Sequence, residues 1–527
     1  MPTPTTSSAF QTLKSHAPDI SRWRTVRAID QLRNKGDVKQ AWLAAVAKLA
    51  AETRPDLSSK VCQILGVSPA DENILEGLTI GELGVVYEAL LADQDHKSRK
   101  EAGQFFTPDD VAEFMAQHLS HFGRTAKWLD PCCGVGNLSW HLAAAHGDAA
   151  RDFVANQLIL VDQDETALRT AVVILAISFL SSDDDAAVDA LKSRAQYRDF
   201  LSPEPLPSYD YAIMNPPYAR SAPRPDFATS NARDLYAYFL ERIEQSARGF
   251  IAITPASFLS GAKFQTTRAL LETRAGGDVY VFDNVPDTCF RGFKYGSKNT
   301  SRTNFVRAAI IVSAPAMQTW RTTPILRWAF RSRETLFASA KDWLSERFIG
   351  PGGAWAKVMP STAVLWNRLS NAGRHLGDLI TITPTAFRLD VASTPRYYIS
   401  ASSIPLQRAS KHVLYFETEA DFEQAYLLLN STLPYWWWRT IAGGISLSRH
   451  TLLTVPIPDE FTLADLNLVE ELRASDRHDR TIKINAGIPN ENVKRPSHLT
   501  HKVNMAVIGK DVPDFSYVYS SDMFALR

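Results

Sequence analysis

The chain is short of cysteine, of long apolar runs and of net charge, and each shortage excludes a class of protein. Only four of its 527 residues are cysteine, and two of these are adjacent, which favours reduced thiols over a disulfide framework. No apolar run approaches the ~20 residues that span a bilayer, and the stretch MPTPTTSSAFQTLKSH lacks the apolar core of a signal peptide. No group of cysteine and histidine has the spacing of zinc ligands. We therefore expect a cytoplasmic protein with no membrane partner and no structural metal.

The charges balance, with 57 lysine and arginine residues against 57 aspartate and glutamate residues. Any binding of nucleic acid must therefore come from a local basic surface rather than from the chain as a whole. Charged residues make up 22% of the chain and hydrophobic residues 45%, which is ordinary for a globular protein. At this length two or three domains are expected.

Three regions differ in pattern. Residues 1–100 are typical of helices: in TIGELGVVYEALLADQ the apolar residues recur at helical spacing, and Thr79 with Glu82 predicts a capping box. Residues 101–319 alternate short apolar runs with helical stretches, which predicts an α/β fold with a doubly wound, mostly parallel sheet. The region 320–527 is rich in tryptophan, arginine and proline, and we expect a mixed α+β domain there. The expected strands are Lys127–Leu129, Leu158–Val161, Tyr211–Met214, Phe250–Ile253, Val279–Phe282 and Val306–Val312.

A glycine turn marks the first βα connection. In KWLDPCCGVGNLSWHLA a strand ends at Asp130, and Gly134 and Gly136 permit a tight turn before a helix. The first turn of a doubly wound sheet is where an adenosine-type cofactor binds, although many turns need glycine for other reasons. The next strand ends in Asp162, about one βαβ unit later, where a carboxylate can accept both ribose hydroxyls. We assign Asp162 to the ribose and Asp164 to the cap of the following helix.

A second feature is the stretch YAIMNPPYAR, in which a buried strand stops at Asn215. Pro216 and Pro217 cannot extend a sheet, because proline has no N–H to donate and its φ is fixed. An Asn-Pro-Pro turn can simply end a strand. Here it follows an Asp-Pro-x-x-Gly-x-Gly turn in the same chain, which favours a functional reading over a structural one.

Together the two motifs carry a resemblance. D-P-x-x-G-x-G resembles motif I of S-adenosylmethionine-dependent methyltransferases, and N-P-P-Y placed after it resembles the N6-adenine DNA methyltransferases of restriction-modification systems, with target recognition last. The resemblance implies a seven-stranded Rossmann-like methyltransferase sheet in 101–319 and a target-recognition domain in 320–527. Two hydrogen-bond acceptors against the target amine, the Asn215 side-chain oxygen and the Pro216 carbonyl, would expose its lone pair. Tyr218 would stack on an adenine flipped out of the duplex.

The resemblance also implies cofactor contacts. Asp130 would face the amino group of S-adenosylmethionine, Asp199 in YRDFLS the adenine amine, and the segment GQFFTPDD the methionine moiety. Thr107 is also a good helix N-cap with Pro108 as the first helical residue. The cofactor residues carried over are Phe105, Thr107, Pro108, Asp130, Pro131, Cys132, Gly134, Gly136, Asp162, Gln163 and Asp199.

A basic loop follows in CFRGFKYGSKNTSRTNFVR, where aromatic residues lie among cations without any acidic residue. This composition suits extruded bases and phosphates, although a solvated basic loop has the same composition. In the family a second stacking aromatic lies here, and we assign it to Phe290, with Phe293 as the second choice. The expected DNA contacts are Arg291, Lys294, Lys298 and Arg302.

Near the C-terminus, LLLNSTLPYWWWRTIAGGISLSRH loosely resembles the end of a target-recognition region. Tyr435 and Trp436–Trp438 are expected to be helix core rather than base-stacking platforms, while Arg439, Arg449 and His450 could reach DNA. Double-stranded DNA is the expected partner, with a cognate endonuclease or a specificity subunit as a further one.

Four alternatives stay open. Type I modification subunits share GQFFTP, but they usually have Asn-Pro-Pro-Phe and borrow a specificity subunit. Protein glutamine methyltransferases share Asn-Pro-Pro-Tyr but are much shorter. An inactive DNA-binding scaffold would not need intact Asp130, Asp162, Asn215 and Tyr218. A fused endonuclease is disfavoured, because the first 100 residues are too few and too helical.

Overall fold

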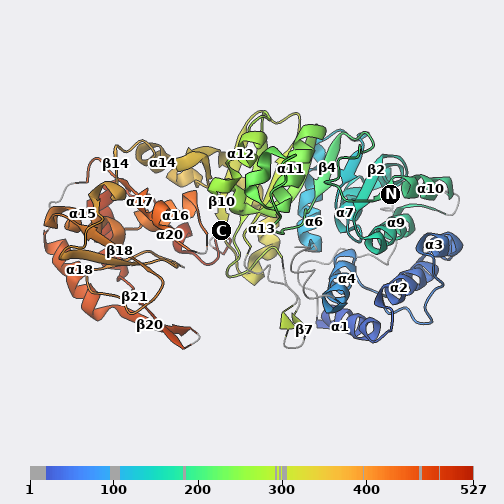
Figure 1. Cartoon of the computed structure of the whole chain (residues 1–527), viewed down its shortest axis with the longest axis horizontal. Coiled ribbons are helices and arrows are strands. Elements are labelled where there is room, and N and C mark those ends of the chain that lie inside the picture. The colour runs from blue at the N-terminus through green and yellow to red at the C-terminus, as the bar shows by residue number, and fades with distance from the viewer. Residues whose placement is uncertain are drawn as a thin grey trace. The chain divides into compact units, whose positions relative to one another are not determined.

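The computed structural model describes residues 19–94, 107–181, 185–290, 294–295, 298–299, 306–395, 397–444, 446–461, 466–485 and 487–525. The chain forms two compact units, and Figure 1 follows it from blue at the N-terminus to red at the C-terminus. The first unit consists of Met1–Phe258, Lys263–Arg321 and Arg327–Asp342, and the second of Leu259–Ala262, Thr322–Leu326 and Trp343–Arg527. The division into three parts near residues 100 and 320 stays a prediction. In the described part of the chain no helix is long and apolar enough to cross a membrane.

The first unit begins with four helices, as the sequence predicts. These are α1 (Asp19–Arg33), α2 (Val38–Thr53), α3 (Ser58–Leu65) and α4 (Ile80–Gln94). The capping box at the start of α4 is confirmed: the Thr79 N–H donates to the Glu82 carboxylate at 2.9 Å, and the Glu82 N–H donates to Thr79 Oγ1 at 3.2 Å. Leu83, Val86 and Leu90 on its apolar face are buried.

Seven strands of the first unit lie in the order β6-β9-β5-β4-β1-β2-β3. The pairs β3–β2, β2–β1, β1–β4 and β4–β5 are parallel, whereas β9 runs antiparallel to both β5 and β6. The strands are β1 (Trp128–Asp130), β2 (Leu158–Asp162), β3 (Ala195–Tyr197), β4 (Tyr211–Met214), β5 (Gly249–Pro255), β6 (Gly277–Phe282) and β9 (Ala308–Ser313). The predicted doubly wound, mostly parallel α/β sheet is therefore confirmed.

Six of these strands match the predicted ones to within two residues at each end. The exception, β3, was not predicted. It is three residues long, and its side chains are half-buried or exposed, so it lacks the continuous apolar run by which a buried parallel strand is found.

Helices connect and cover the strands of the first unit. They are α6 (Asp109–Ala116), α7 (Asn137–Ala145), α8 (Ala150–Asp152), α9 (Glu165–Phe179), α10 (Asp185–Ser193), α11 (Leu235–Ser246), α12 (Gln265–Leu271) and α13 (Arg333–Ser339). Helix α9 is buried along nearly its whole length, because β2 and β3 contact one side and α2 and α3 the other. Trp42 on α2 donates a 3.0 Å hydrogen bond to Thr170 on α9. Helices α2 and α3 thus pack against α9, which in turn contacts the sheet.

The second unit is a mixed α and β structure, as predicted. An antiparallel sheet has the order β15-β18-β16-β17, from β15 (Ile380–Thr381), β18 (Lys411–Phe416), β16 (Phe387–Ala392) and β17 (Ala401–Ser402). Two further antiparallel pairs are the hairpin of β12 (Phe348–Gly350) with β13 (Ala354–Ala356) and the pair of β14 (Arg374–His375) with β19 (Pro456–Ile457), which are distant in the sequence. Its helices include α14 (Ala363–Leu369), α15 (Glu419–Asn430), α16 (Leu433–Ile441), α17 (Arg449–Leu453), α18 (Leu466–His478), α19 (Ser497–Ile508) and α20 (Ser516–Tyr519).

The tryptophan-rich helix α16 forms the core of this unit. Trp436, Trp437 and Trp438 are each at most 2% exposed, which confirms that they are core residues. Trp437 stacks on Trp366 of α14 with ring centroids 5.1 Å apart. Arg439 is only 8% exposed, so the expectation that it could reach DNA is wrong, because its helix is buried on all sides.

Candidate active site

A cavity of about 180 Å³ lies at the carboxyl edge of the first unit's sheet, lined by the segments that follow β1, β2, β3 and β4. The strand order reverses there, since β2 and β3 lie on one side of β1, and β4 and β5 on the other. Ligands of doubly wound sheets bind at this switch point. The predicted site residues that line the cavity are Thr107, Asp130, Pro131, Cys132, Gly134, Asp162, Gln163, Asp199, Asn215 and Pro217.

The turn after β1 depends on its two glycines. Gly134 and Gly136 have φ values of +53° and +95°, in the left-handed region that disfavours other residues. A Cβ on Gly136 would also lie 3.1–3.2 Å from Ala171 of α9. Gly136 does not line the cavity; it allows α7 to start close to α9 and leaves the turn open toward the cavity.

Asp130 is a fully buried carboxyl at the end of β1. The Ser139 hydroxyl donates to it at 2.8 Å and the Cys132 N–H at 3.4 Å, and both donors are neutral. Burial raises the pKa of Asp130 to about 7. Ser139 stands where dinucleotide-binding turns have their third glycine, so the departure from G-x-G-x-x-G provides a hydrogen bond to this carboxyl.

Asp162 ends β2 and is 8% exposed where it faces the cavity. Its two oxygens accept N–H bonds from Gly134 at 2.7 Å and Asp164 at 2.8 Å. Burial raises its pKa to about 6, although these two bonds lower it. They orient the carboxylate and tie the turn after β1 to the end of β2.

Asp164 caps α9, as predicted, by accepting from the N–H groups of Thr166 and Ala167. Its other oxygen accepts a 2.7 Å hydrogen bond from the hydroxyl of Tyr87, which lies on α4 and also lines the cavity. The N-terminal helices therefore supply part of the cavity wall. The sequence placed Tyr87 on the apolar face of α4 but did not indicate a partner for its hydroxyl.

Thr107 joins three segments of the cavity. Its carbonyl accepts a 2.5 Å hydrogen bond from Asn137 Nδ2, and its hydroxyl accepts a 3.0 Å bond from Asn215 Nδ2. The prediction of Thr107 as the N-cap is wrong, because α6 has its N-cap at Pro108 and the Thr107 hydroxyl is engaged by Asn215 instead. The opposite end of the Asn137 amide, Oδ1, is buried and has no hydrogen-bond partner among the described residues.

The tip of β4 holds the Asn-Pro-Pro-Tyr motif. The Asn215 carbonyl accepts from the Cys132 thiol at 3.3 Å, so the tip is joined to the glycine turn as well as to Thr107. Pro216 is buried, while Asn215 and Pro217 line the cavity. The fixed φ angles of Pro216 and Pro217, together with these hydrogen bonds, hold the Asn215 amide in place beside the glycine turn.

Tyr218 lies beside this tip and outside the cavity lining. Its hydroxyl donates to the Ile253 carbonyl at 3.0 Å, and burial raises its pKa well above the ordinary value. Its ring meets that of Phe290 edge to face, with centroids 5.7 Å apart and an interplanar angle of 76°. The structure thus brings together the two aromatics that the sequence assigned to base stacking, but the rings touch rather than face each other across a gap.

A buried arginine holds the segment before Phe290. Arg333 of α13 is fully buried and pairs with Asp110 of α6 through two bonds, one of them 3.0 Å long. Its other N–H groups donate to the carbonyls of Thr288 at 2.6 Å and Cys289 at 2.9 Å. One guanidinium therefore links the helix that starts after Thr107 to the segment that ends in Phe290. Sequence reasoning missed it, because a single arginine carries no local signal for its distant partners.

The segment after β3 forms another wall of the cavity. Asp199 lines it and accepts from the Leu201 N–H at 2.9 Å. Phe200, which the sequence did not single out, also lines the cavity and packs against Phe239 with ring centroids 4.9 Å apart. This wall offers an apolar ring beside a carboxylate, an arrangement that suits a heterocyclic base.

Several predicted residues lie outside the described part of the chain. These are Phe105, Arg291, Phe293 and Arg302, together with the side chains of Lys294 and Lys298 in the strands β7 (Lys294–Tyr295) and β8 (Lys298–Asn299). Their predicted contacts stay predictions.

Part of the first unit matches the model of a known protein family. The model of the N-6 DNA Methylase family matches residues 79–248, which include α4, the glycine turn and the Asn-Pro-Pro-Tyr tip. The resemblance inferred from the two motifs is thereby confirmed.

Two relatives align over the same part of the chain. The Type II methyltransferase M.VspI of Vibrio sp. (strain 343) is 27% identical over 185 residues, or 33% of this chain and 41% of that protein. The Type II methyltransferase M.PstI of Providencia stuartii is 24% identical over 215 residues, or 38% of this chain and 42% of that protein. The chain thus spans about two fifths of the length of the curated relatives it matches.

Among solved structures, the Type IIL restriction-modification enzyme MmeI in complex with DNA aligns over 97% of this chain and 99% of that chain, with 11% identity and a TM-score of 0.47. The type IIG restriction endonuclease BpuSI aligns over 93% of this chain and 78% of that chain, with 11% identity and a TM-score of 0.45.

Proposed function

We propose that this chain, whose residues 79–248 match the N-6 DNA methylase family, transfers a methyl group from S-adenosylmethionine to N6 of an adenine in DNA, as the modification enzyme of a restriction-modification or phage-defence system. The observation that carries the proposal is that the glycine turn and the Asn-Pro-Pro-Tyr tip are joined through Cys132 and Thr107 and open on one cavity.

The polar side chains of the cavity suit the proposed cofactor. The buried Asp130 has only neutral donors in its recorded hydrogen bonds, so an ammonium group beside it would favour the ionised carboxylate. Asn137 Oδ1, buried without a partner among the described residues, could accept from the same cation. Asp162 would accept the ribose hydroxyls, while Asp199 and Phe200 would hold the adenine. When bound, S-adenosylmethionine supplies an electrophilic methyl group.

The tip of β4 would act on the target amine. An exocyclic amine on a base is a weak nucleophile, because its lone pair is delocalised into the ring. Asn215 Oδ1 and the Pro216 carbonyl would accept from its two hydrogens and make the lone pair available. Since the prolines and the bond to Thr107 hold these acceptors in place, little reorganisation is needed during the reaction. No strong general base is required.

Tyr218 and Phe290 would flank an adenine extruded from the duplex. In the structure their rings touch edge to face, so a base between them requires Phe290 to move away from Tyr218. Arg333 anchors the two carbonyls before Phe290 and would limit this motion to the Phe290 side chain. The extrusion costs a few kcal/mol, which ring stacking offsets in part.

The test is to express the protein in a methylation-deficient host and to map N6-methyladenine by single-molecule sequencing. Wild type should methylate adenine in one recurrent motif, and Asn215→Ala should abolish the signal. Asn156→Ala, an exposed asparagine of the same unit, is the matched control and should leave methylation unchanged. A protein that binds S-adenosylmethionine but methylates no DNA in this host would contradict an enzyme that works without a specificity subunit.

A further inference from the structure

The hairpin of the second unit carries exposed apolar side chains. It is formed by β20 (Arg480–Asn485) and β21 (Ile488–Val493), and its distal end extends away from the rest of its unit (Figure 1). Ile482, Ile484 and Ile488 are 57%, 73% and 56% exposed. Exposed apolar strands invite aggregation and are usually shortened or covered. A hairpin that keeps three such residues therefore calls for an account of what covers them.

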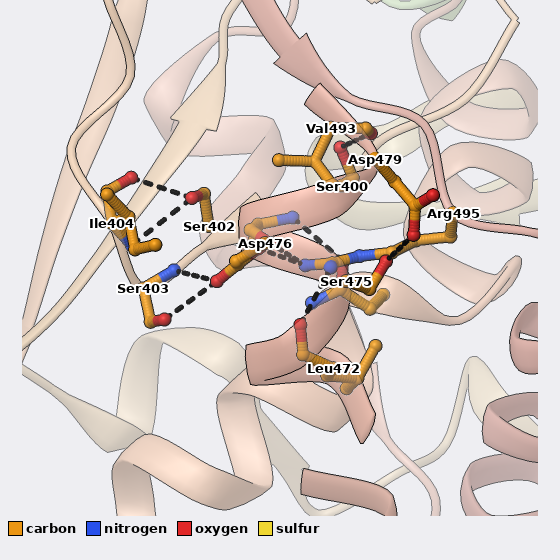
Figure 2. A network of polar contacts seen from close by, with 12 residues as sticks. Ser400, Ser402, Ser403, Ile404, Leu472, Ser475, Asp476, Asp479, Val493 and Arg495 are labelled. Carbon is orange, nitrogen blue, oxygen red and sulfur yellow. Dashed lines mark hydrogen bonds and ion pairs between the residues drawn. The ribbon is translucent and has the colours of Figure 1, made fainter. Parts of the chain in front are cut away.

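The base of the hairpin is held firmly, as Figure 2 shows. Asp476 of α18 is fully buried and accepts from the backbone N–H and the hydroxyl of Ser403, each at 2.7 Å, and from Arg495 at 2.6 Å. Arg495 also donates to the Leu472 carbonyl at 2.9 Å, and Ser400 donates to the Val493 carbonyl at 2.7 Å. The root of β21 is thereby fixed to α18 and to the segment that leads into β17.

A second contact neutralises the hairpin's carboxylate. Arg480 pairs with Glu491 through two bonds of 2.6 and 2.7 Å, and the Gln407 N–H donates to the same carboxylate at 2.7 Å. Beyond this pair, toward the turn at Gly487, the sequence has no acidic residue. The tip is thus a rigidly mounted ribbon whose charge comes from Lys483.

The surrounding sequence is strongly basic in a chain of zero net charge. From 480 to 510 Glu491 is the one carboxylate in the sequence, whereas the cations are Arg480, Lys483, Lys494, Arg495, Lys502 and Lys510. Lys483 and Lys494 are exposed. Three of these cations are paired with carboxylates: Arg480 with Glu491, Arg495 with Asp476 and Lys502 with Glu471. The exposed Lys483 and Lys494 supply the local positive charge that a neutral chain needs if it binds a polyanion.

The two faces of the ribbon differ. Residues directly opposite in an antiparallel pair share a face, so Lys483 and Asn490 lie together, with Ile488 on the same face, while Ile484 and Pro489 lie on the other side with Ile482. Ammonium and amide groups can bind purine edges, and apolar side chains contact the methyl group of thymine. A two-stranded ribbon is also an element that the major groove admits.

We propose that the β20–β21 hairpin enters the major groove of duplex DNA and that Lys483 and Asn490 contact base edges there. The inference rests on the proposed function, because the second unit would then recognise the DNA sequence around the adenine that is methylated. The rigid base presents the ribbon without a large ordering cost. DNA accounts for the basic charge and the amide together, which an apolar protein partner would not.

The test compares Lys483→Ala, Asn490→Ala and Ile488→Ser, which lie on one face of the hairpin, with Ile382→Ser in the full chain. Ile382 is 96% exposed in the same unit and lies outside the hairpin, so it controls for loss of an exposed isoleucine. The readouts are the methylation motif mapped in a deficient host and the binding of fluorescein-labelled duplexes with the mapped and a scrambled sequence, measured by anisotropy at several salt concentrations. If no motif is mapped, sheared host DNA serves as the duplex.

The tip variants should bind the mapped duplex roughly tenfold more weakly and methylate a motif relaxed at one position, and Ile382→Ser should match wild type. If wild type methylates DNA and all tip variants bind and methylate as it does, the hairpin inference fails while the proposed function survives. Wild type that binds DNA without methylating it contradicts the proposed function and leaves the hairpin to be judged by binding alone. Wild type that binds no duplex overturns both, and tip variants that change only the sedimentation coefficient would assign the hairpin to contact between copies.

Discussion

The cavity of the first unit and the hairpin of the second handle charge in opposite ways. The cavity collects carboxyls, and the two at the ends of β1 and β2 are almost fully buried and held by neighbouring N–H and O–H groups. The hairpin presents an exposed cation and exposed isoleucines on a ribbon that is held at its base. Buried groups are coupled to folding and to pH, whereas exposed groups are not. Substitutions in the first unit should therefore change stability, and substitutions at the hairpin tip should change recognition alone.

The largest effect is expected from Arg333→Met. It removes the partner of Asp110 and the donors to the Thr288 and Cys289 carbonyls, so the free energy of unfolding should fall by about 3–5 kcal/mol. Denaturant unfolding monitored by tryptophan fluorescence measures the change.

Arg194→Met is the matched control for this prediction. Arg194 donates to the carbonyls of Leu158, Val154 and Ala155 in the same unit, with no carboxylate among these partners. Its loss should be smaller, about 1–2 kcal/mol. Equal losses in the two variants would show that the ion pair with Asp110 adds nothing to stability.

Arg333→Lys keeps the positive charge but not the fork of N–H donors to the carbonyls before Phe290. This variant should bind S-adenosylmethionine normally. It should give a weaker fluorescence increase when 2-aminopurine replaces the target adenine in a duplex.

Gly136→Ala should have the next largest effect. The added methyl group would lie 3.1–3.2 Å from Ala171 of α9, and the alanine backbone would have to adopt a φ of +95°. Together these effects should lower the free energy of unfolding by about 1–3 kcal/mol. Gly147→Ala, at φ +58° with open space around its Cβ, separates backbone strain from crowding. Thermal unfolding of both variants measures the two parts, and an equally stable Gly136→Ala would refute the close approach of the helices.

A pH effect should follow from Asp130. Its pKa in the folded chain is raised to about 7 from an ordinary value of 3.8, so the folded state retains a proton that the unfolded state has released between these values. The free energy of unfolding should therefore fall as the pH rises from about 4 to about 7. In Asp130→Asn this fall should be shallower, while Glu82 and Asp162, whose pKa values burial raises to about 7 and about 6, maintain the remainder. Unfolding measured across this range in the two proteins decides the matter, and parallel curves would contradict the assignment.

The smallest effect on stability is expected at the hairpin tip. Ile484 is 73% exposed, so Ile484→Ser should change the free energy of unfolding by less than about 0.5 kcal/mol. A loss above 1 kcal/mol in chemical denaturation would mean that the tip is packed in solution and would remove the contrast with the cavity.

Much of the first unit was predictable from the sequence because its signals are local. The capping box at Thr79 and Glu82, the cap at Asp164 and the strand ends at Asp130 and Asp162 each depend on residues within one turn or one strand. The motif order was also sufficient to place Asp130 and Asn215 at one cavity, since parallel strands end at a common edge.

What the sequence did not predict depends on distant partners. The Thr107 hydroxyl binds Asn215 instead of capping its own helix, and Tyr87 reaches Asp164 from a helix more than seventy residues earlier. The hairpin had a usable signal, the near absence of carboxylates from 480 to 510, but no motif drew attention to it. Its isoleucines alternate with polar residues as in any half-buried strand, so only their exposure in the structure distinguishes them.

The central claim, that the glycine turn and the β4 tip form one methyl-transfer site, is tested most directly by a single-turnover reaction. Purified protein is mixed with S-adenosylmethionine carrying a labelled methyl group and with the duplex mapped in the host. Wild type should move the label to adenine N6, and Asn215→Ala should bind cofactor and DNA as wild type does but react roughly 100- to 1000-fold more slowly. An unchanged rate in Asn215→Ala, or label on a group other than adenine N6, would contradict the account.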